Sequence, residues 1–201
     1  MSKPTLELMG INDNQRAAAT ELADDLDIVL TEGCKFIFEM SGSGIEISWD
    51  GSVGKVRYAA PHMFARCLGL ICEKFKQGED SFEIREIPAY TMLGVMPDCS
   101  RNAVLTVETF KKLTRRLALM GYSMIQLYTE DTFEMKEYPY FGYMRGRYTK
   151  EELKEMDSYA ALFGIELMPC IQTLAHLGTT LRWEAHLDMA DFEDTLLVDE
   201  D

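Results

Sequence analysis

The second half of this 201-residue chain repeats one pattern: an apolar strand, a polar tip and then an amphipathic helix. Hydrophobic runs predict the strands at residues 90–96, 123–128 and 165–168. Strands that are apolar on both faces and alternate with helices form βαβ units, in which neighbouring strands run parallel. This rhythm predicts an α/β fold with a parallel sheet, and it constrains the chain more than any other feature.

The two complete helices of this half are marked at both ends. Thr106 precedes a run whose apolar residues fall on one helical face, and Gly121 ends that run. Thr149 and Glu152 have the spacing of a capping box, and Gly164 ends the second helix. We therefore expect one helix after each of the first two strands, packed through its apolar stripe.

The first half mixes short strands with helices. Ile45, Ile47 and Trp49 alternate with polar residues, as in a half-buried strand, and Asp50-Gly51 is a hairpin signal. Further strands are expected at 6–9, 35–40, 53–58 and 82–87, and helices at 12–25 and 61–78. These features predict a small α+β sheet domain over residues 1–87, followed by a second domain over residues 88–201.

Composition limits the partners and the compartment. The formal net charge of −14 makes nucleic acid and anionic membrane surfaces poor partners. No apolar run approaches the ~18 residues of a membrane span, and residues 1–5 do not resemble a secretory signal. The five cysteines are an odd number without CxxC spacing, which predicts neither disulfides nor a zinc site. We expect a cytoplasmic protein without metal or cofactor.

Polar side chains follow each of the three predicted strands. They are Asp98, Ser100, Arg101 and Asn102 after the first, Glu130 and Asp131 after the second, and Gln172, Thr173 and His176 after the third. Ligands of parallel α/β folds lie beyond the carboxyl ends of the strands, so these residues are expected to converge. Each of them, taken alone, fits a loop cap or a surface group equally well.

Three segments together resemble one enzyme family. Residues 93–102 (LGVMPDCSRN) resemble the motif R-G-x-x-x-D-x-x-R, residues 126–131 (QLYTED) resemble H-x-x-x-D-D, and residues 169–176 (PCIQTLAH) resemble P-x-I-x-x-x-x-H. These are strand-end motifs of glycoside hydrolase family 20, the exo-β-N-acetylhexosaminidases. Order and spacing agree over residues 90–183, with most likeness to the atypical cytoplasmic bacterial branch. The resemblance implies that residues 88–201 begin a TIM (β/α)8 barrel.

The resemblance also implies roles for five residues. Arg101, with Asp98, would bind the terminal N-acetylhexosamine, because a guanidinium can donate two hydrogen bonds to the adjacent O3 and O4 hydroxyls. Asp131, Glu130 and His176 would form the supporting network, although Glu130 stands where the family usually has Asp. The alternatives are an ion pair of Arg101 with Asp98 or Asp131, and a structural histidine near a helix start.

The loop between residues 130 and 148 is long and aromatic. Its aromatic residues are Phe133, Tyr138, Tyr140, Phe141, Tyr143 and Tyr148. Long loops at strand ends are usually functional. We expect this loop to close over the sugar, with plain packing as the alternative for Tyr138 and Phe141.

The family's catalytic pair is expected outside the chain. Its substrate-assisted, retaining mechanism uses an Asp-Glu pair after the fourth strand. Asp199-Glu200 resembles such a pair, but a crossover to a fourth strand needs a dozen or more residues with a helix, so we expect the pair beyond residue 201. Three βα units cannot close an eight-stranded barrel. The chain is thus expected to be an inactive fragment that self-associates through its open barrel edge.

Two other functions remain open from the sequence. One is a carbohydrate-binding protein that keeps Arg101 but performs no chemistry. The other is a barrel enzyme of another family, such as a metal-dependent deacetylase. The second is disfavoured because His62, His176 and His186 have no metal-ligand spacing.

Overall fold

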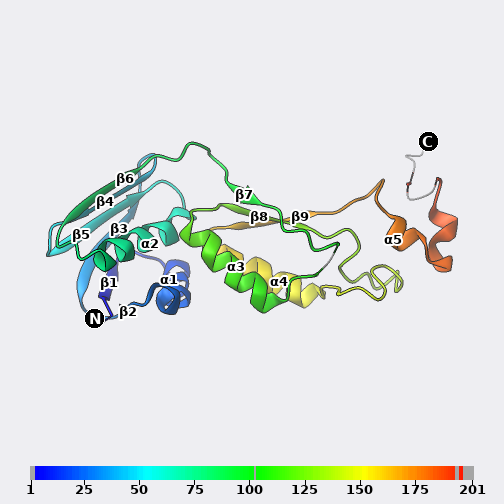
Figure 1. Cartoon of the computed structure of the whole chain (residues 1–201), viewed down its shortest axis with the longest axis horizontal. Helices are drawn as coiled ribbons and strands as arrows, with labels where there is room; N and C mark the ends of the chain where they lie inside the picture. Colours follow the sequence, from blue (N-terminus) through cyan, green and yellow to red (C-terminus); the bar gives the residue numbers. More distant parts are fainter. Residues whose placement is uncertain (1–2, 102, 193–194, 197–201) are drawn as a thin grey trace. The chain divides into compact units, whose positions relative to one another are not determined.

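The protein was analysed as a computed structural model that describes residues 3–101, 103–192 and 195–196 (Figure 1). Two compact units make up this mixed α/β chain. The first contains Met1–Gly94, Lys111–Met124 and Tyr159–Glu166, and the second contains Val95–Phe110, Ile125–Ser158 and Leu167–Asp201. Because two helices run from one unit into the other, these units do not test the predicted boundary at residues 87 and 88.

A six-stranded sheet forms the first unit, in the order β2-β1-β3-β5-β4-β6. The strands are β1 (Thr5–Met9), β2 (Val29–Leu30), β3 (Cys34–Met40), β4 (Ile45–Trp49), β5 (Val53–Tyr58) and β6 (Phe82–Glu86). The hairpin predicted at Asp50-Gly51 joins the antiparallel pair β4–β5, whereas β3 and β5 are parallel. The five predicted strands of this half are confirmed to within one residue, and only β2 has no counterpart in the prediction.

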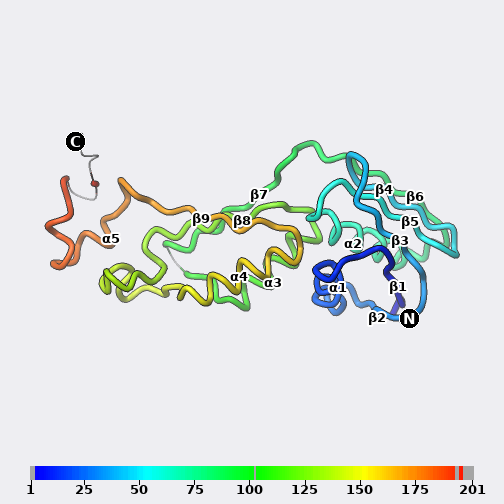
Figure 2. The backbone as a smooth tube through the Cα atoms, turned by 180° about the vertical axis from the view of Figure 1, so that it is seen from behind, coloured from blue at the N-terminus to red at the C-terminus, as the bar shows by residue number. Residues whose placement is uncertain are grey.

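Two helices, α1 (Asp13–Leu26) and α2 (Met63–Lys76), cover one side of this sheet (Figure 1, Figure 2). Asn12 caps α1 with the side chain of Gln15 in a capping box. The helices bury their apolar faces against alternate residues of the strands, such as Phe36, Phe38 and Val56. The period-2 pattern of the strands and the period-3.6 pattern of the helices therefore meet in one core.

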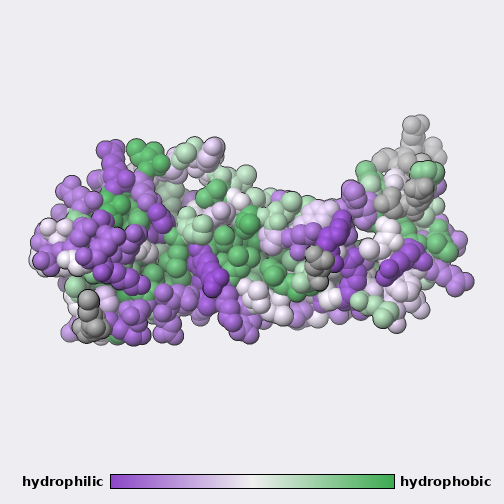
Figure 3. Space-filling model, in the orientation of Figure 1, coloured by the Kyte–Doolittle hydropathy of each residue, from purple (hydrophilic) through white to green (hydrophobic). Residues whose placement is uncertain are grey.

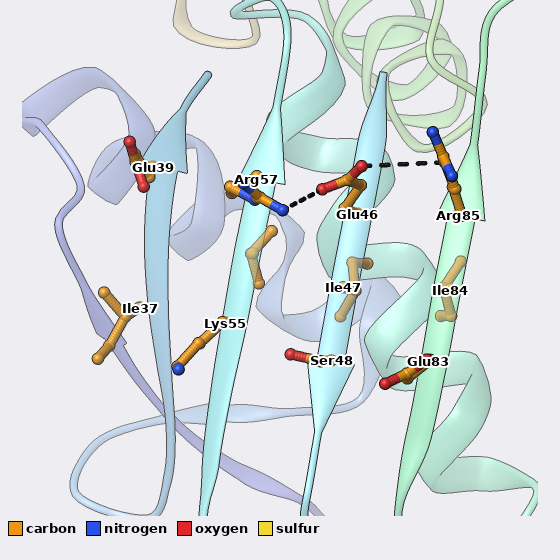
Figure 4. A pocket seen from close by; sticks show the side chains of 11 residues that line it. Ile37, Glu39, Glu46, Ile47, Ser48, Lys55, Arg57, Glu83, Ile84 and Arg85 are labelled. Carbon is orange, nitrogen blue, oxygen red and sulfur yellow. Dashed lines mark hydrogen bonds and ion pairs between the residues drawn. The ribbon is translucent and has the colours of Figure 1, made fainter. Parts of the chain in front are cut away.

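The other side of the sheet is charged and hollowed by about 870 Å³ (Figure 4). A row of alternating charge crosses four strands there, through Glu39, Arg57, Glu46 and Arg85. Glu46 forms ion pairs with Arg57 and, at 3.8 Å, with Arg85. Opposite charges on neighbouring strands stabilise the register by about 0.2–1 kcal/mol per pair. The charged residues that line this hollow are therefore explained by the pairing of the strands.

A second, three-stranded sheet has the order β7-β8-β9. It consists of β7 (Gly94–Val95), β8 (Met124–Tyr128) and β9 (Glu166–Cys170), with α3 (Val107–Leu119) and α4 (Lys150–Leu162) between them. A parallel bridge joins Asp98 to Tyr128. The predicted α/β class and both helix caps are confirmed, since Thr106 accepts from the Thr109 N–H and Thr149 pairs with Glu152.

The first strand of this sheet is shorter than predicted. The expected strand at 90–96 is reduced to Gly94–Val95, and the side chains of Tyr90, Met92 and Leu93 are exposed. Leu93 is held by the backbone and hydroxyl of Ser123. A strand at the edge of a sheet has ladder partners on one side only, so apolar composition alone overstates its length.

No described helix combines the length and the apolarity that crossing a bilayer requires. Figure 3 shows hydrophilic residues over much of the visible face, with hydrophobic patches between them. After β9 the chain forms the short helix α5 (Gly178–Leu181) and the 3-10 turn η1 (Glu184–Met189).

Gly54 in β5 makes room for a stacked pair of aromatic rings in the first core. Its strand partners are Phe36 on β3 and Trp49 on β4, whose rings stack with centroids 5.0 Å apart. A Cβ at Gly54 would lie 2.0 Å from a Phe36 ring carbon. A strand glycine of this kind marks a close approach of neighbouring groups.

We expect Gly54→Ala to lower the free energy of unfolding by about 1–3 kcal/mol, because the added methyl group overpacks the core. The measurement is urea denaturation followed by circular dichroism. The matched control is Gly69→Ala in α2, whose added Cβ would meet Leu119 at an ordinary 3.4 Å. That change should raise the free energy by about 0.5–1 kcal/mol. Equal effects of the two substitutions would contradict this account of the core.

Candidate functional site

The turn after β7 presents Arg101. The Asp98 carboxylate accepts hydrogen bonds from the Ser100 N–H at 2.8 Å and the Ser100 hydroxyl at 2.7 Å. These bonds hold the pKa of Asp98 below its ordinary value. Ser100 in turn accepts a hydrogen bond from Arg101 Nη1 at 2.7 Å. Asp98 therefore orients the turn, and it acts on Arg101 through Ser100 and through the attraction between their charges.

Arg101 forms an ion pair with Glu130, at the end of β8. This partner differs from the two that the sequence offered, Asp98 and Asp131. The Arg101 side chain is 52% exposed, whereas that of Glu130 is 4% exposed. The hydrogen bonds of Arg101 to described residues use Nη1 of the exposed guanidinium.

Glu130 and Asp131 are consecutive buried carboxylates. Glu130 has a φ of 51°, a left-handed conformation that costs a non-glycine residue about 1–2 kcal/mol. Such strain persists where the surroundings impose it, frequently at functional sites. The Asp131 carbonyl lies so close to Gly142 that a Cβ there would be 2.1 Å away. The aromatic loop is thus packed directly onto the acidic pair.

Arg145 is the residue of this site that the sequence reasoning missed. Its side chain is only 17% exposed, and Nη1 lies 2.9 Å from Asp131 Oδ1 and 4.0 Å from Glu130 Oε2. Its Nη2 donates a hydrogen bond to the Ser100 carbonyl. Arg145 therefore ties the loop to the ends of β7 and β8. The available signal was two arginines, Arg145 and Arg147, inside the aromatic loop of an acidic chain.

The third strand end reaches Asp131 through α5. The Thr180 hydroxyl donates to Asp131 Oδ2 at 3.3 Å, and the Thr180 carbonyl accepts from Nδ1 of the buried His186 at 3.2 Å. His176 is instead exposed and has a φ of 60°. Among the described residues, no bond joins His176 to Asp98, Arg101, Glu130 or Asp131. The histidine that is linked to Asp131, through Thr180, is therefore one that the motif spacing did not indicate.

The aromatic loop contributes both packing and exposed rings. Phe133 packs against Phe141 with ring centroids 5.0 Å apart, and the buried Tyr148 hydroxyl donates to Cys99 Sγ. Burial raises the pKa of Tyr148. For Phe141 the structure therefore favours plain packing, the alternative to a contact with the sugar. Tyr138 contacts the His186 ring and remains partly exposed.

Three carboxylates, of Asp98, Glu130 and Asp131, and two guanidinium groups give this site a formal charge of only −1. Such a site can hold a polar, uncharged ligand by donors fixed on Arg101 and acceptors on the carboxylates. Within the described ranges, no group of three His, Cys, Asp or Glu side chains could hold a metal ion. Asn102 and the pair Asp199-Glu200 lie outside the described residues.

Comparison by sequence finds no matching family model and no matching curated protein. Comparison by structure finds enzymes of one family. A family 20 exo-β-N-acetylglucosaminidase from Vibrio harveyi, in complex with N-acetylglucosamine, has a TM-score of 0.74 at 17% identity. It is matched over 98% of this chain and 39% of its own.

Two further enzymes give the same result. The family 20 β-N-acetylhexosaminidase from Streptomyces coelicolor A3(2) has a TM-score of 0.71 at 19% identity, over 98% of this chain and 50% of its own. The β-N-acetylhexosaminidase from Bacteroides fragilis NCTC 9343 has a TM-score of 0.70 at 20% identity, over 93% of this chain and 44% of its own.

These likenesses define the fold. The chain has the α/β fold of part of a family 20 β-N-acetylhexosaminidase, which confirms at this level the resemblance drawn from the three motifs. It spans half or less of the length of these three enzymes.

We expect Arg145→Met to lower the free energy of unfolding by about 3–5 kcal/mol, because it leaves the buried Asp131 carboxylate without its cation. The control is Arg57→Met, which breaks the exposed ion pair with Glu46 and should cost about 1 kcal/mol or less. Chemical denaturation at neutral pH measures both. A loss in Arg57→Met as large as in Arg145→Met would show that burial does not determine the cost of removing an arginine from its ion pair.

Proposed function

We propose that this chain is part of an exo-acting glycosidase that removes terminal, non-reducing β-linked N-acetylhexosamine. The single observation that carries the proposal is Arg101. Its guanidinium is exposed at the end of β7, yet it is oriented by Ser100 and by the buried Glu130. A planar guanidinium in a fixed orientation suits two adjacent hydroxyls of a sugar. The fold of the structural neighbours supports the same function.

The proposed reaction is substrate-assisted and retains the anomeric configuration. The 2-acetamido oxygen of the sugar attacks the anomeric carbon, an Asp orients the acetamido group, and the adjacent Glu protonates the leaving oxygen. We assign no described residue of this chain to that Asp-Glu pair. In this chain Arg101 binds the sugar, and Glu130, Asp131 and Arg145 hold Arg101 and its turn in place. We also propose a cytoplasmic location, because all five cysteines are free.

Titration of the chain with N-acetylglucosamine tests Arg101. We expect Arg101→Lys to weaken the affinity by about tenfold or more, because lysine cannot reproduce the two-pronged hydrogen bonding. The control is Arg57→Lys, an exposed arginine of the charged sheet face, which should leave the affinity unchanged. Equal affinity in the Arg101→Lys variant would refute sugar recognition by this residue.

Two companion measurements separate the enzyme fragment from a competent enzyme. A thiazoline mimic of the transition state should bind these 201 residues no more tightly than the sugar does, since the attacking geometry needs the missing carboxylates. An aryl β-N-acetylglucosaminide should remain uncleaved. Robust turnover that disappears in Glu200→Gln would place the catalytic pair inside the chain.

We also propose that the chain alone self-associates through the open edges of the β7-β8-β9 sheet. β7 is an end strand of its sheet, and the preceding Tyr90 and Met92 are exposed. Unpaired edges beside apolar side chains favour association. Light scattering should give a mass above that of the monomer, and Met92→Lys should lower it. Met144→Lys, at another exposed methionine, is the control. A monomeric wild type that melts cooperatively would exclude this interface.

A further inference from the structure

Tyr128 is the last residue of β8 and pairs with the turn that bears Arg101. Its N–H donates to the Pro97 carbonyl at 3.2 Å, and its carbonyl accepts from the Cys99 N–H at 2.9 Å. These two hydrogen bonds flank Asp98, with which Tyr128 forms the parallel bridge. The backbone of Tyr128 therefore fixes the start of the turn from which Arg101 projects.

The side chain of Tyr128 contacts both Arg101 and its acidic partner. The guanidinium carbon of Arg101 lies 6.0 Å from the centre of the Tyr128 ring, at the limit of a cation–π contact. The Tyr128 hydroxyl donates a long hydrogen bond of 3.4 Å to Oε1 of Glu130, and Arg101 Nη1 pairs with the same oxygen. The ring and the hydroxyl of one residue thus meet both members of the ion pair.

The guanidinium plane of Arg101 needs a contact of this kind, because the side chain is 52% exposed. The hydrogen bonds of Arg101 to Ser100 and Glu130 both use Nη1, and bonds at a single atom do not fix the plane of the group. An exposed side chain that a ligand must first immobilise costs conformational entropy on binding. An aromatic ring beside the guanidinium restricts its rotation before any ligand arrives.

We propose that Tyr128 is a positioning residue, which orients Arg101 for the two adjacent hydroxyls of the terminal sugar. This inference rests on the proposed function, since it names a residue that prepares the same site for its ligand. Tyr128 acts through Arg101 and not through the sugar, by reducing the entropy that the arginine loses on binding. Its effect on affinity should therefore exist only when residue 101 has a guanidinium plane to orient.

Titration with N-acetylglucosamine in a double-mutant cycle tests this role. We expect Tyr128→Leu to weaken the affinity of the chain about three- to tenfold, the equivalent of one cation–π contact or one immobilised side chain. Tyr128→Phe keeps the ring and should stay within about twofold of the wild type. In an Arg101→Lys background, Tyr128→Leu should cause no further loss. A merely structural role predicts the same loss in both backgrounds.

Relaxation of the arginine Nε–Hε groups, measured by 15N NMR, gives a readout without sugar. The internal reference is Arg57, which is 59% exposed and also pairs with a carboxylate. In the wild type, Arg101 should be more ordered than Arg57. Tyr128→Leu should lower the order of Arg101 to that of Arg57, whereas Tyr128→Phe should preserve it. The control is Tyr122→Leu, at a half-buried tyrosine of the other unit, which should change neither arginine.

The two measurements separate this inference from the proposed function. An Arg101 that stays ordered in Tyr128→Leu, or an equal loss of affinity in both backgrounds, would overturn the positioning role and leave sugar recognition by Arg101 standing. Loss of order in Tyr128→Leu, with an affinity that neither substitution changes, would support the positioning of Arg101 and refute its role in sugar binding. Tyr128→Phe disturbs the fold least, so a disordered Arg101 in that variant alone would overturn the role of the ring.

Discussion

The removal of two consecutive carboxylates from water is the constraint on which the second unit depends. Glu130 and Asp131 are almost fully buried, and a buried charge is tolerated only when it is paired and hydrogen-bonded. The partners come from three separate places: Arg101 after β7, Arg145 in the loop after β8, and Thr180 after β9. Pairing and hydrogen bonding of these two carboxylates therefore join all three strand ends.

The two arginines around this pair have different tasks because they differ in burial. Arg145 is largely buried and also donates to a backbone carbonyl of the turn after β7. Its charge therefore compensates a buried carboxylate. Arg101 is half exposed, and the Tyr128 ring lies 6.0 Å from its guanidinium carbon. Arg145 thus pairs mainly with Asp131, whereas Arg101 pairs with Glu130 and keeps part of its guanidinium exposed to solvent.

The sequence predicted what local patterns encode. Period-2 and period-3.6 runs located the strands of the first sheet, both capped helices and the order of strand ends, because these signals lie within a few residues. The sequence did not predict the features that depend on contacts between residues far apart in the chain. The two-residue β7 depends on Ser123, thirty positions away, and the role of Arg145 depends on a loop that folds back onto Asp131. His186 is near the acidic pair through Thr180, and no spacing motif records that contact.

The loop after β8 carries both the arginine that pairs with the buried Asp131 and the partly exposed aromatic rings. Gly142 allows this loop to approach the Asp131 carbonyl, Arg145 then reaches the buried acids, and Tyr143 between them directs its ring to Trp183. A side chain at position 142 would meet backbone atoms, so the loop can reach the acids only through this glycine. The positions of the aromatic rings are therefore a consequence of the same packing that neutralises Glu130 and Asp131. Charge burial, rather than aromatic packing alone, fixes the geometry of this edge of the sheet.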